Sequence, residues 1–178
     1  MSPYRRLVER IESPSFLDGL EEKSVEELRA DRAECQEAER ELSFERRLCQ
    51  ARMDILSAEI EQRQGRASQP LVERLPQILA KEDAPRSDGL PTRAPDSSIP
   101  RNADVPRRRV DEIIEEQALA RLFDVPEAEL RTIIESLSAH EKRVSEQRKR
   151  VHEVVDAIQE EIVKRYTSGQ ADPTQAPR

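Results

Sequence analysis

Residues 24–65 read SVEELRADRAECQEAERELSFERRLCQARMDILSAEIEQRQG, a run without proline whose only glycine is its last residue. Ser24 and Glu27 have the spacing of a capping box, and Gly65 is typical of a helix end. Within the run, apolar side chains recur every seven positions, as at the d positions of a heptad. They are Leu28, Cys35, Leu42, Cys49 and Leu56. This pattern predicts one long helix over residues 24–65.

The same pattern returns over residues 125–167, which Gly169 follows. The second seam consists of Leu130, Leu137, Val144, Val151 and Ile158. Several a positions of the two runs are charged, which is unusual for a purely structural coiled coil. Examples are Arg32, Glu39, Arg46, Glu141 and Arg148. The sequence therefore predicts an all-α fold in which two long helices form an intramolecular antiparallel coiled coil.

The remaining segments are assigned from their composition. Residues 1–23 form an N-terminal extension, and residues 66–82 are expected to form short helical turns around Pro70 and Pro76. Residues 83–106 are rich in proline, serine and aspartate, which predicts a disordered, flexible tether. Residues 107–124 are predicted to form a short amphipathic helix, after which Asp124 caps the second long helix. Residues 168–178 are predicted to be a disordered tail.

Composition excludes several classes of protein. Of 178 residues, 38% are charged and 3% are aromatic, and there are four glycines and no tryptophan. Such a chain lacks the apolar and aromatic residues of a deep globular core and the Gly-rich loops of nucleotide-fold enzymes. We find no cluster of metal ligands and no positioned nucleophile and base, so an enzyme is not expected. The net charge of −7 disfavours general binding to DNA or RNA.

The expected location is the cytoplasm. No stretch is long and apolar enough to span a membrane, and the N-terminus lacks the apolar region of a signal peptide. Cys35 and Cys49 are about 21 Å apart if both lie on one helix, too far for a disulfide between them. Their d positions predict small buried hydrophobic residues. His140 is expected at the surface.

The two long runs align at an offset of 102 residues with the heptad register kept, and polar residues are repeated. Each run contains E-x3-S-x2-R-x3-[Q/H]-x3-D. At about 100° per residue the five side chains fall within an arc of about 80° beside the seam. The residues are Glu39, Ser43, Arg46, Gln50 and Asp54 in the first run, and Glu141, Ser145, Arg148, His152 and Asp156 in the second.

Two interpretations of this polar stripe compete. Charged residues beside a coiled-coil seam pair across helices and set register, as Glu39 with Arg148 or Arg46 with Glu141 would do. Repetition of the stripe at a fixed offset favours a polar ligand instead. Arginine donates to guanine O6 and N7, aspartate accepts from guanine N–H groups, and Ser, Gln and His add adaptable hydrogen bonds. An anionic guanine nucleotide fits this set.

The stripe resembles the signature of the RsiG family, cyclic di-GMP-responsive anti-sigma factors of sporulating actinobacteria. That signature is E-x3-S-x2-R-x3-Q-x3-D on each of two long antiparallel helices. The first copy in this chain is complete, and the second departs from the signature only at His152. The resemblance implies that the ten stripe residues bind cyclic di-GMP, as two stacked molecules, and that no metal takes part.

The resemblance also implies a partner and a mechanism. The nucleotide-loaded protein would capture WhiG, a flagellar-type sigma factor that drives sporulation genes, and would release it when nucleotide falls. DNA, RNA and membranes are not expected as partners. The competing function is a coiled-coil adaptor or chaperone that needs no ligand, in which the stripe only sets register.

Overall fold

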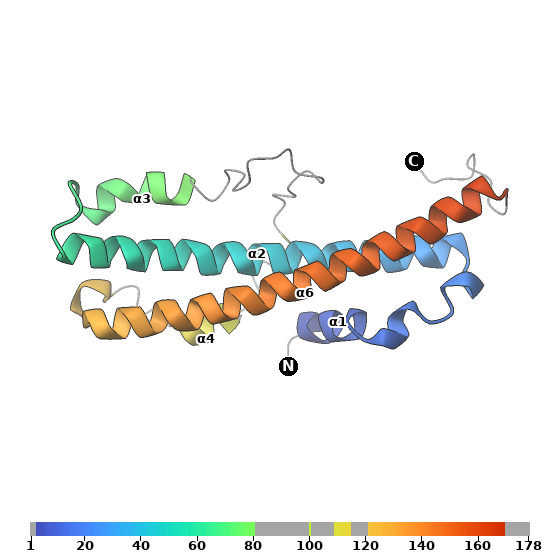
Figure 1. The fold of residues 1–178 in the computed structure, drawn as a ribbon, viewed down its shortest axis with the longest axis horizontal. Coiled ribbons are helices and arrows are strands. Elements are labelled where there is room, and N and C mark those ends of the chain that lie inside the picture. Colours follow the sequence, from blue (N-terminus) through green and yellow to red (C-terminus); the bar gives the residue numbers. More distant parts are fainter. Residues whose placement is uncertain (1–2, 81–99, 101–108, 115–120, 170–178) are drawn as a thin grey trace. The chain divides into compact units, whose positions relative to one another are not determined.

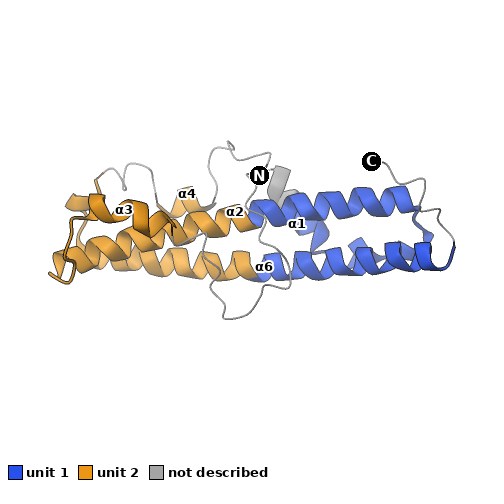
Figure 2. Ribbon diagram, turned by 90° about the horizontal axis from the view of Figure 1, so that it is seen from above, with its two compact units in different colours: residues 1–42, 146–178 blue, residues 43–145 orange. Residues whose placement is uncertain are grey.

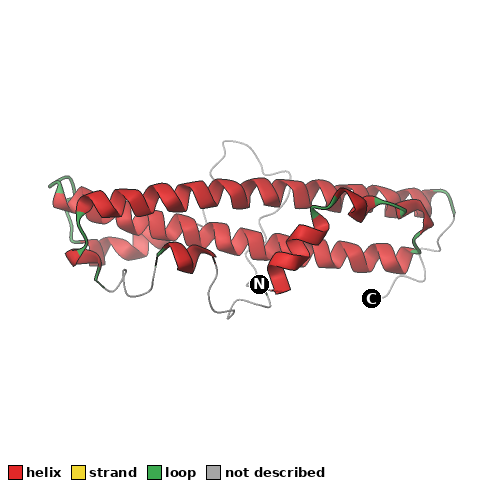
Figure 3. Cartoon of the chain, turned by 90° about the horizontal axis from the view of Figure 1, so that it is seen from below, coloured by secondary structure: helices red, strands yellow, loops and turns green. Residues whose placement is uncertain are grey.

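The computed structural model describes residues 3–80, 100, 109–114 and 121–169, and this part of the chain consists of helices joined by turns and loops (Figure 3). Two helices dominate it. They are α2 (Val25–Arg63, 39 residues) and α6 (Glu127–Thr167, 41 residues). The two run antiparallel and pack against each other (Figure 1). The predicted all-α fold with two long paired helices is therefore confirmed.

The ends of α2 form as the sequence indicates. The Ser24 N–H donates to Glu27 Oε2 at 2.7 Å, and the Glu27 N–H donates to Ser24 Oγ at 3.2 Å, which completes the capping box. At the other end Gly65 has a φ of 68°, and the Arg66 N–H donates to the Glu61 carbonyl at 3.0 Å. This Schellman-type ending needs a left-handed residue, and glycine adopts that conformation without a steric penalty.

The start of α6 differs from the prediction. Asp124 does not cap the helix, because it belongs to a preceding 3-10 turn, η4 (Leu122–Asp124). The helix begins at Glu127, and the Pro126 carbonyl accepts the Leu130 N–H at 3.1 Å. Proline fits this place because the first N–H groups of a helix have no partner within it.

The ten seam residues predicted at d positions are all at most 2% exposed. They are Leu28, Cys35, Leu42, Cys49, Leu56, Leu130, Leu137, Val144, Val151 and Ile158. Because seven-residue spacing keeps these side chains on one stripe of each helix, the seam supplies the continuous apolar contact between α2 and α6.

The chain divides into two compact units, and α2 and α6 contribute to both (Figure 2). Unit 1 comprises residues 1–42 and 146–178, and unit 2 comprises residues 43–145.

Unit 1 contains the first half of α2, the second half of α6 and three short elements. These are α1 (Pro3–Ile11), η1 (Pro14–Leu17) and η2 (Leu20–Glu22). Val8 and Ile11 of α1 are buried, and Glu12 accepts hydrogen bonds from Gln147 at 3.2 Å and from Arg150 at 2.8 Å. The N-terminal extension thus supplies a third helix to this unit.

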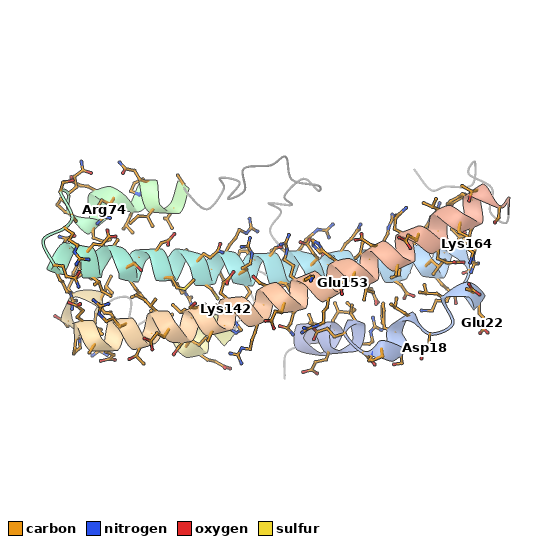
Figure 4. The ribbon with its side chains drawn as sticks, in the orientation of Figure 1. Asp18, Glu22, Arg74, Lys142, Glu153 and Lys164 are labelled. Atoms are coloured by element: carbon orange, nitrogen blue, oxygen red, sulfur yellow. The ribbon has the colours of Figure 1, made fainter. Side chains whose placement is uncertain are left out.

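Unit 2 contains the other halves of the long helices with α3 (Leu71–Ala80), α4 (Arg109–Ile113) and η4. Residues from all five elements share one buried apolar cluster. Its members are Cys49, Leu56, Ala58, Ile60, Leu71, Ile78, Val110, Ile114, Leu122, Leu130 and Leu137. Helix α3 continues through Pro76, so it is longer than the predicted turns. Figure 4 labels Arg74 on α3, whose guanidinium donates to Glu61 of α2 at 2.7 Å.

Several predicted segments lie largely or partly outside the described residues. Of the expected tether over residues 83–106, only Pro100 is described, and it is buried. Of the expected helix over residues 107–124, the described parts are α4, which ends at Ile113, and η4. Of the expected tail, Ser168 and Gly169 are described, in the turn that follows α6.

Candidate functional site

The stripe residues occur in both units, and each unit receives them from both long helices. The unit 1 cluster, as we call it, consists of Glu39, Arg148, His152 and Asp156. The unit 2 cluster consists of Ser43, Arg46, Gln50, Asp54, Glu141 and Ser145. Within each unit, antiparallel pairing therefore places the glutamate of one repeat opposite the arginine of the other repeat, as the sequence predicts.

In the unit 1 cluster, the carboxylate of Glu39 on α2 accepts from α6. Arg148 Nε donates to Glu39 Oε1 at 2.9 Å. His152 Nε2 lies 3.1 Å from the same oxygen, close enough for an ion pair when the ring is protonated but not aligned for a hydrogen bond. The three side chains are partly buried, and Asp156 is exposed.

In the unit 2 cluster, the carboxylate of Glu141 on α6 plays the equivalent part. Gln50 Nε2 donates to Glu141 Oε1 at 3.3 Å, and Ser145 Oγ donates to the same oxygen at 2.9 Å. Arg46 Nη1 lies 3.9 Å from it, a looser ion pair than that of Glu39 with Arg148. Ser43 and Gln50 are buried, whereas Asp54 is only partly so.

The two clusters share one arrangement. In each, a glutamate from one repeat contacts the arginine of the other repeat and that repeat's Gln or His. His152 occupies the place of Gln50, as the repeat offset requires. Both pairs named by the register interpretation, Glu39–Arg148 and Arg46–Glu141, are present. Such cross-helix pairs are compatible with either interpretation of the stripe.

Chemically, each cluster offers a planar guanidinium, an amide or imidazole, and carboxylates on one edge of the helix pair, and the unit 2 cluster adds the hydroxyls of Ser43 and Ser145. Arginine presents several N–H donors in a plane and can stack on a base as well as bind phosphate. Glu39 and Glu141 pair with these arginines across the helices, which offsets part of the cost of burying a charge. The arrangement can bind a flat, anionic, hydrogen-bonding ligand.

The expectation that His140 lies at the surface is wrong. His140 is 7% exposed, and its Nε2 lies 2.8 Å from Oε1 of Glu45, which is 6% exposed. Both residues are at g positions of the heptad, and the g positions of antiparallel helices meet beside the seam. The pair was not predicted, because neither the a and d positions nor the polar stripe includes a g position.

A second feature that was not predicted is a pair of arginines, each of which binds the loop that leads into the other long helix. Arg63 of α2 donates to the carbonyls of Leu122 and Val125 at 2.8 and 2.6 Å. Arg165 of α6 donates to the carbonyls of Leu20 and Glu21 at 3.1 and 2.7 Å.

These two arginines are related by the same offset of 102 residues, and so are the carboxylates that hold them. Glu59 accepts from Arg63 at 2.7 Å, and Glu161 accepts from Arg165 at 2.9 Å. Hydrogen bonding to Arg165, together with nearby Lys164, lowers the pKa of Glu161. The signal was in the sequence, because Glu59/Glu161 and Arg63/Arg165 are identical at the repeat offset.

The cysteines behave as predicted for small buried residues. Both are free and buried, and burial raises the pKa of each thiol to about 12. A thiolate is therefore disfavoured at neutral pH, which makes these thiols poor nucleophiles.

Neither a metal site nor a membrane span is found in the part of the chain that the structure describes. Among these residues, no three or more His, Cys, Asp or Glu side chains are placed to hold a metal ion. None of the helices described in residues 3–169 combines the length and apolarity needed to cross a membrane.

The fold and the site define a class: an antiparallel two-helix protein that carries a duplicated polar motif along its pairing edge. A model of the RsiG-like family matches residues 14–79 and 116–178, which is more than half of the chain. The chain belongs to the RsiG-like family. Membership suggests an anti-sigma factor role, and the family is regulatory rather than catalytic. No curated protein matches the chain.

Proposed function

We propose that this protein is a cyclic di-GMP-dependent anti-sigma factor that sequesters a flagellar-type sigma factor, WhiG, and so represses sporulation genes. The observation that carries the proposal is the repeated cluster. Arg148 and His152 meet Glu39 in unit 1, as Arg46 and Gln50 meet Glu141 in unit 2. A device that only set register would not need the same residue types twice at one offset.

The ligand chemistry follows from the donors. Arg46 and Arg148 supply guanidinium groups for guanine or phosphate, and Asp54 and Asp156 supply acceptors for guanine N1–H and N2–H₂. Gln50, His152 and the two serines add hydrogen bonds. An approaching nucleotide competes with Glu39 and Glu141 for the arginines, so binding exchanges internal ion pairs for contacts with the ligand.

Gating follows from linkage. A nucleotide controls sigma-factor capture only if it binds the sigma-competent state better than the free state. The binding-competent helix pair would then be ordered by the nucleotide, and the sigma factor would be released to RNA polymerase when nucleotide is lost.

Calorimetric titration of the full chain with cyclic di-GMP, and with cyclic di-AMP as control, tests ligand binding. Arg46→Ala and Arg148→Ala should each weaken binding about 5- to 150-fold, because a good arginine–guanine pair contributes about 1–3 kcal/mol. Arg32→Ala is the matched control, since Arg32 is also a charged a-position residue that bonds across the helices, to Gln159, but lies outside the stripe. Equal losses in all three variants would contradict a nucleotide site.

A second measurement tests the gate. The purified sigma factor should bind the chain more tightly in the presence of cyclic di-GMP than in its absence, and Arg148→Ala should abolish the difference. Equal affinity in both conditions would remove the gating step and leave the alternative function.

That alternative is a coiled-coil adaptor that needs no ligand. It is favoured by one observation, namely that both glutamate–arginine pairs of the register interpretation, Glu39–Arg148 and Arg46–Glu141, are formed across the helices. It predicts that the arginine variants lower the melting temperature and leave partner binding unchanged.

A further inference from the structure

Unit 2 contains a buried acid–base pair that the proposed ligand site does not use. Glu45 of α2 and His140 of α6 are both more than nine-tenths buried, with Glu45 Oε1 2.8 Å from His140 Nε2. Each residue directly precedes a member of the unit 2 cluster in the sequence, Glu45 before Arg46 and His140 before Glu141. The pair therefore lies in the same layer of the helix pair as the site.

Stability does not account for this pair. Removing two polar, ionisable side chains from water costs free energy, and an apolar pair of similar size is often equally or more stable. His140 Nδ1 is also buried without a hydrogen-bond partner in the described part of the chain, which adds a further cost. Buried polar pairs of this kind are best known for fixing the register and pairing of helices.

Unit 1 provides the comparison. The residues at the repeat-equivalent positions there are Gln147 and Ala38, and Ala38 is fully buried. Gln147 donates to Glu12, which follows α1, at 3.2 Å. Unit 1 instead has the closer contact within its cluster, with Arg148 Nε and Glu39 Oε1 2.9 Å apart, against 3.9 Å for Arg46 and Glu141 in unit 2.

We propose that Glu45 and His140 are positioning residues that fix the register of α2 against α6 in unit 2. By holding the layer next to them, they keep Arg46 and Gln50 opposite Glu141 and Ser145 in the arrangement that receives the ligand. They act through their neighbours and do not touch the nucleotide. The nucleotide half of this inference rests on the proposed function, and the register half does not.

The test compares two neutral variants of the full chain. Glu45→Gln/His140→Ala gives unit 2 the residues of unit 1, and Glu45→Gln/His140→Gln restores a hydrogen-bonding pair without charge. Spin labels on Ala51→Cys and Thr132→Cys report the register within unit 2. The two native thiols are buried with a raised pKa, so they label poorly.

The wild-type pair and the Gln/Gln pair should give one narrow distance distribution and cyclic di-GMP affinities within about threefold of each other. The Gln/Ala variant should give a broad or split distribution and at least tenfold weaker binding. If the Gln/Ala variant does not fold, Glu45→Leu/His140→Leu takes its place in the test. We expect the Leu/Leu variant to have a melting temperature at least as high as that of the wild type, and to show the same broad or split distance distribution. A narrow distribution with unchanged affinity in the variant that folds would overturn the inference.

Failure of the two proposals is distinguishable. If wild type binds no cyclic di-GMP but the Gln/Ala distribution broadens, the proposed function is wrong and the register role stands. If wild type binds and the Gln/Ala variant binds equally well with a narrow distribution, the register role is wrong and the ligand site stands.

Discussion

Unit 1 and unit 2 are built from the same repeat, yet they differ in surface charge and in what is added to the helix pair. Unit 1 adds α1 at its N-terminus, whereas unit 2 adds α3 and α4. Among the exposed side chains that the structure describes, acidic residues clearly outnumber basic ones in unit 1, while the two signs are balanced in unit 2. Asp18, Glu22 and Glu153 of unit 1 and Lys142 of unit 2 are among them (Figure 4).

What the two units share is informative. Three features are repeated: the seam, the glutamate–arginine contact, and an arginine that holds the loop leading into the other long helix. The added helices and the charge of the surface are not repeated. The shared features are those that align two helices and present polar donors between them. This difference indicates that the repeat preserves the site and that the remaining surfaces are specific to each unit.

The largest expected effect comes from the seam, where Leu28 of unit 1 and Leu130 of unit 2 are equivalent and both buried. Leu28→Ala and Leu130→Ala should each lower the free energy of unfolding by about 2–5 kcal/mol, because each leaves a cavity. Urea denaturation measures the loss, and hydrogen exchange shows where it falls. Protection lost only in the mutated unit would mean that the units open separately, and loss in both would mean that they unfold together.

Next in size are the loop-holding arginines. Arg63→Ala and Arg165→Ala should each cost about 1–3 kcal/mol, because each removes hydrogen bonds from a charged donor to backbone carbonyls, one of which is partly buried in each loop. Thermal denaturation measures the cost, and Arg131→Ala, which removes an exposed pair with Glu127, is the control expected to change little. A neutral result for Arg63 alone would show that unit 2 holds its loop by the apolar cluster instead.

A smaller effect is expected at the N-termini of the two long helices, which begin differently: α2 with a capping serine and α6 with a proline. Ser24→Ala removes the capping hydrogen bond to the Glu27 N–H and should cost about 1 kcal/mol. Pro126→Ala, at the start of α6, removes no hydrogen bond and should change the free energy of unfolding by only a few tenths of the Ser24→Ala effect. Melting curves of the two variants measure the difference, and equal shifts would contradict the assigned roles.

The smallest effect concerns pH. Hydrogen bonds from Ser24 lower the pKa of Glu27 in unit 1, and those from Arg131 and Gln64 lower the pKa of Glu127 in unit 2. A carboxyl group whose pKa is lowered on folding stabilises the fold at pH values above its ordinary pKa of 4.5. This stabilisation is lost as the pH falls through the lowered pKa. Circular dichroism between pH 6 and 2 should show a shallower acid transition for Glu27→Gln and Glu127→Gln. An unchanged acid transition would mean that other carboxylates govern it.

Much of the fold followed from local pattern. The seven-residue spacing predicted the buried stripe of each helix because the period of a coiled coil is a property of the backbone. The capping box and Gly65 predicted the ends of α2 because they act within one turn. The match of the stripe residues across the repeat similarly predicted which glutamate meets which arginine once the helices are antiparallel.

The features that were missed depend on neighbours distant in sequence. Nothing near His140 in the chain indicates that Glu45, on the other helix, will bury it. Helix α1 lies outside the matched family region and has no strong heptad, and it is positioned by contacts from Glu12 to α6. Pro76 discouraged the prediction of α3, yet the contacts of Arg74 and the burial of Ile78 against α2 hold that helix in place.

The sequence by itself determined two long helices, their buried seams and a polar motif repeated at one offset, because these properties arise from periodicity along a single helix. Only the tertiary structure decided that Glu45 and His140 form a buried pair, that Arg63 and Arg165 hold the loops that precede the long helices, and that the two clusters differ in how closely glutamate meets arginine. Those features depend on which side chains the antiparallel pairing brings level, and that alignment is set by packing across the seam.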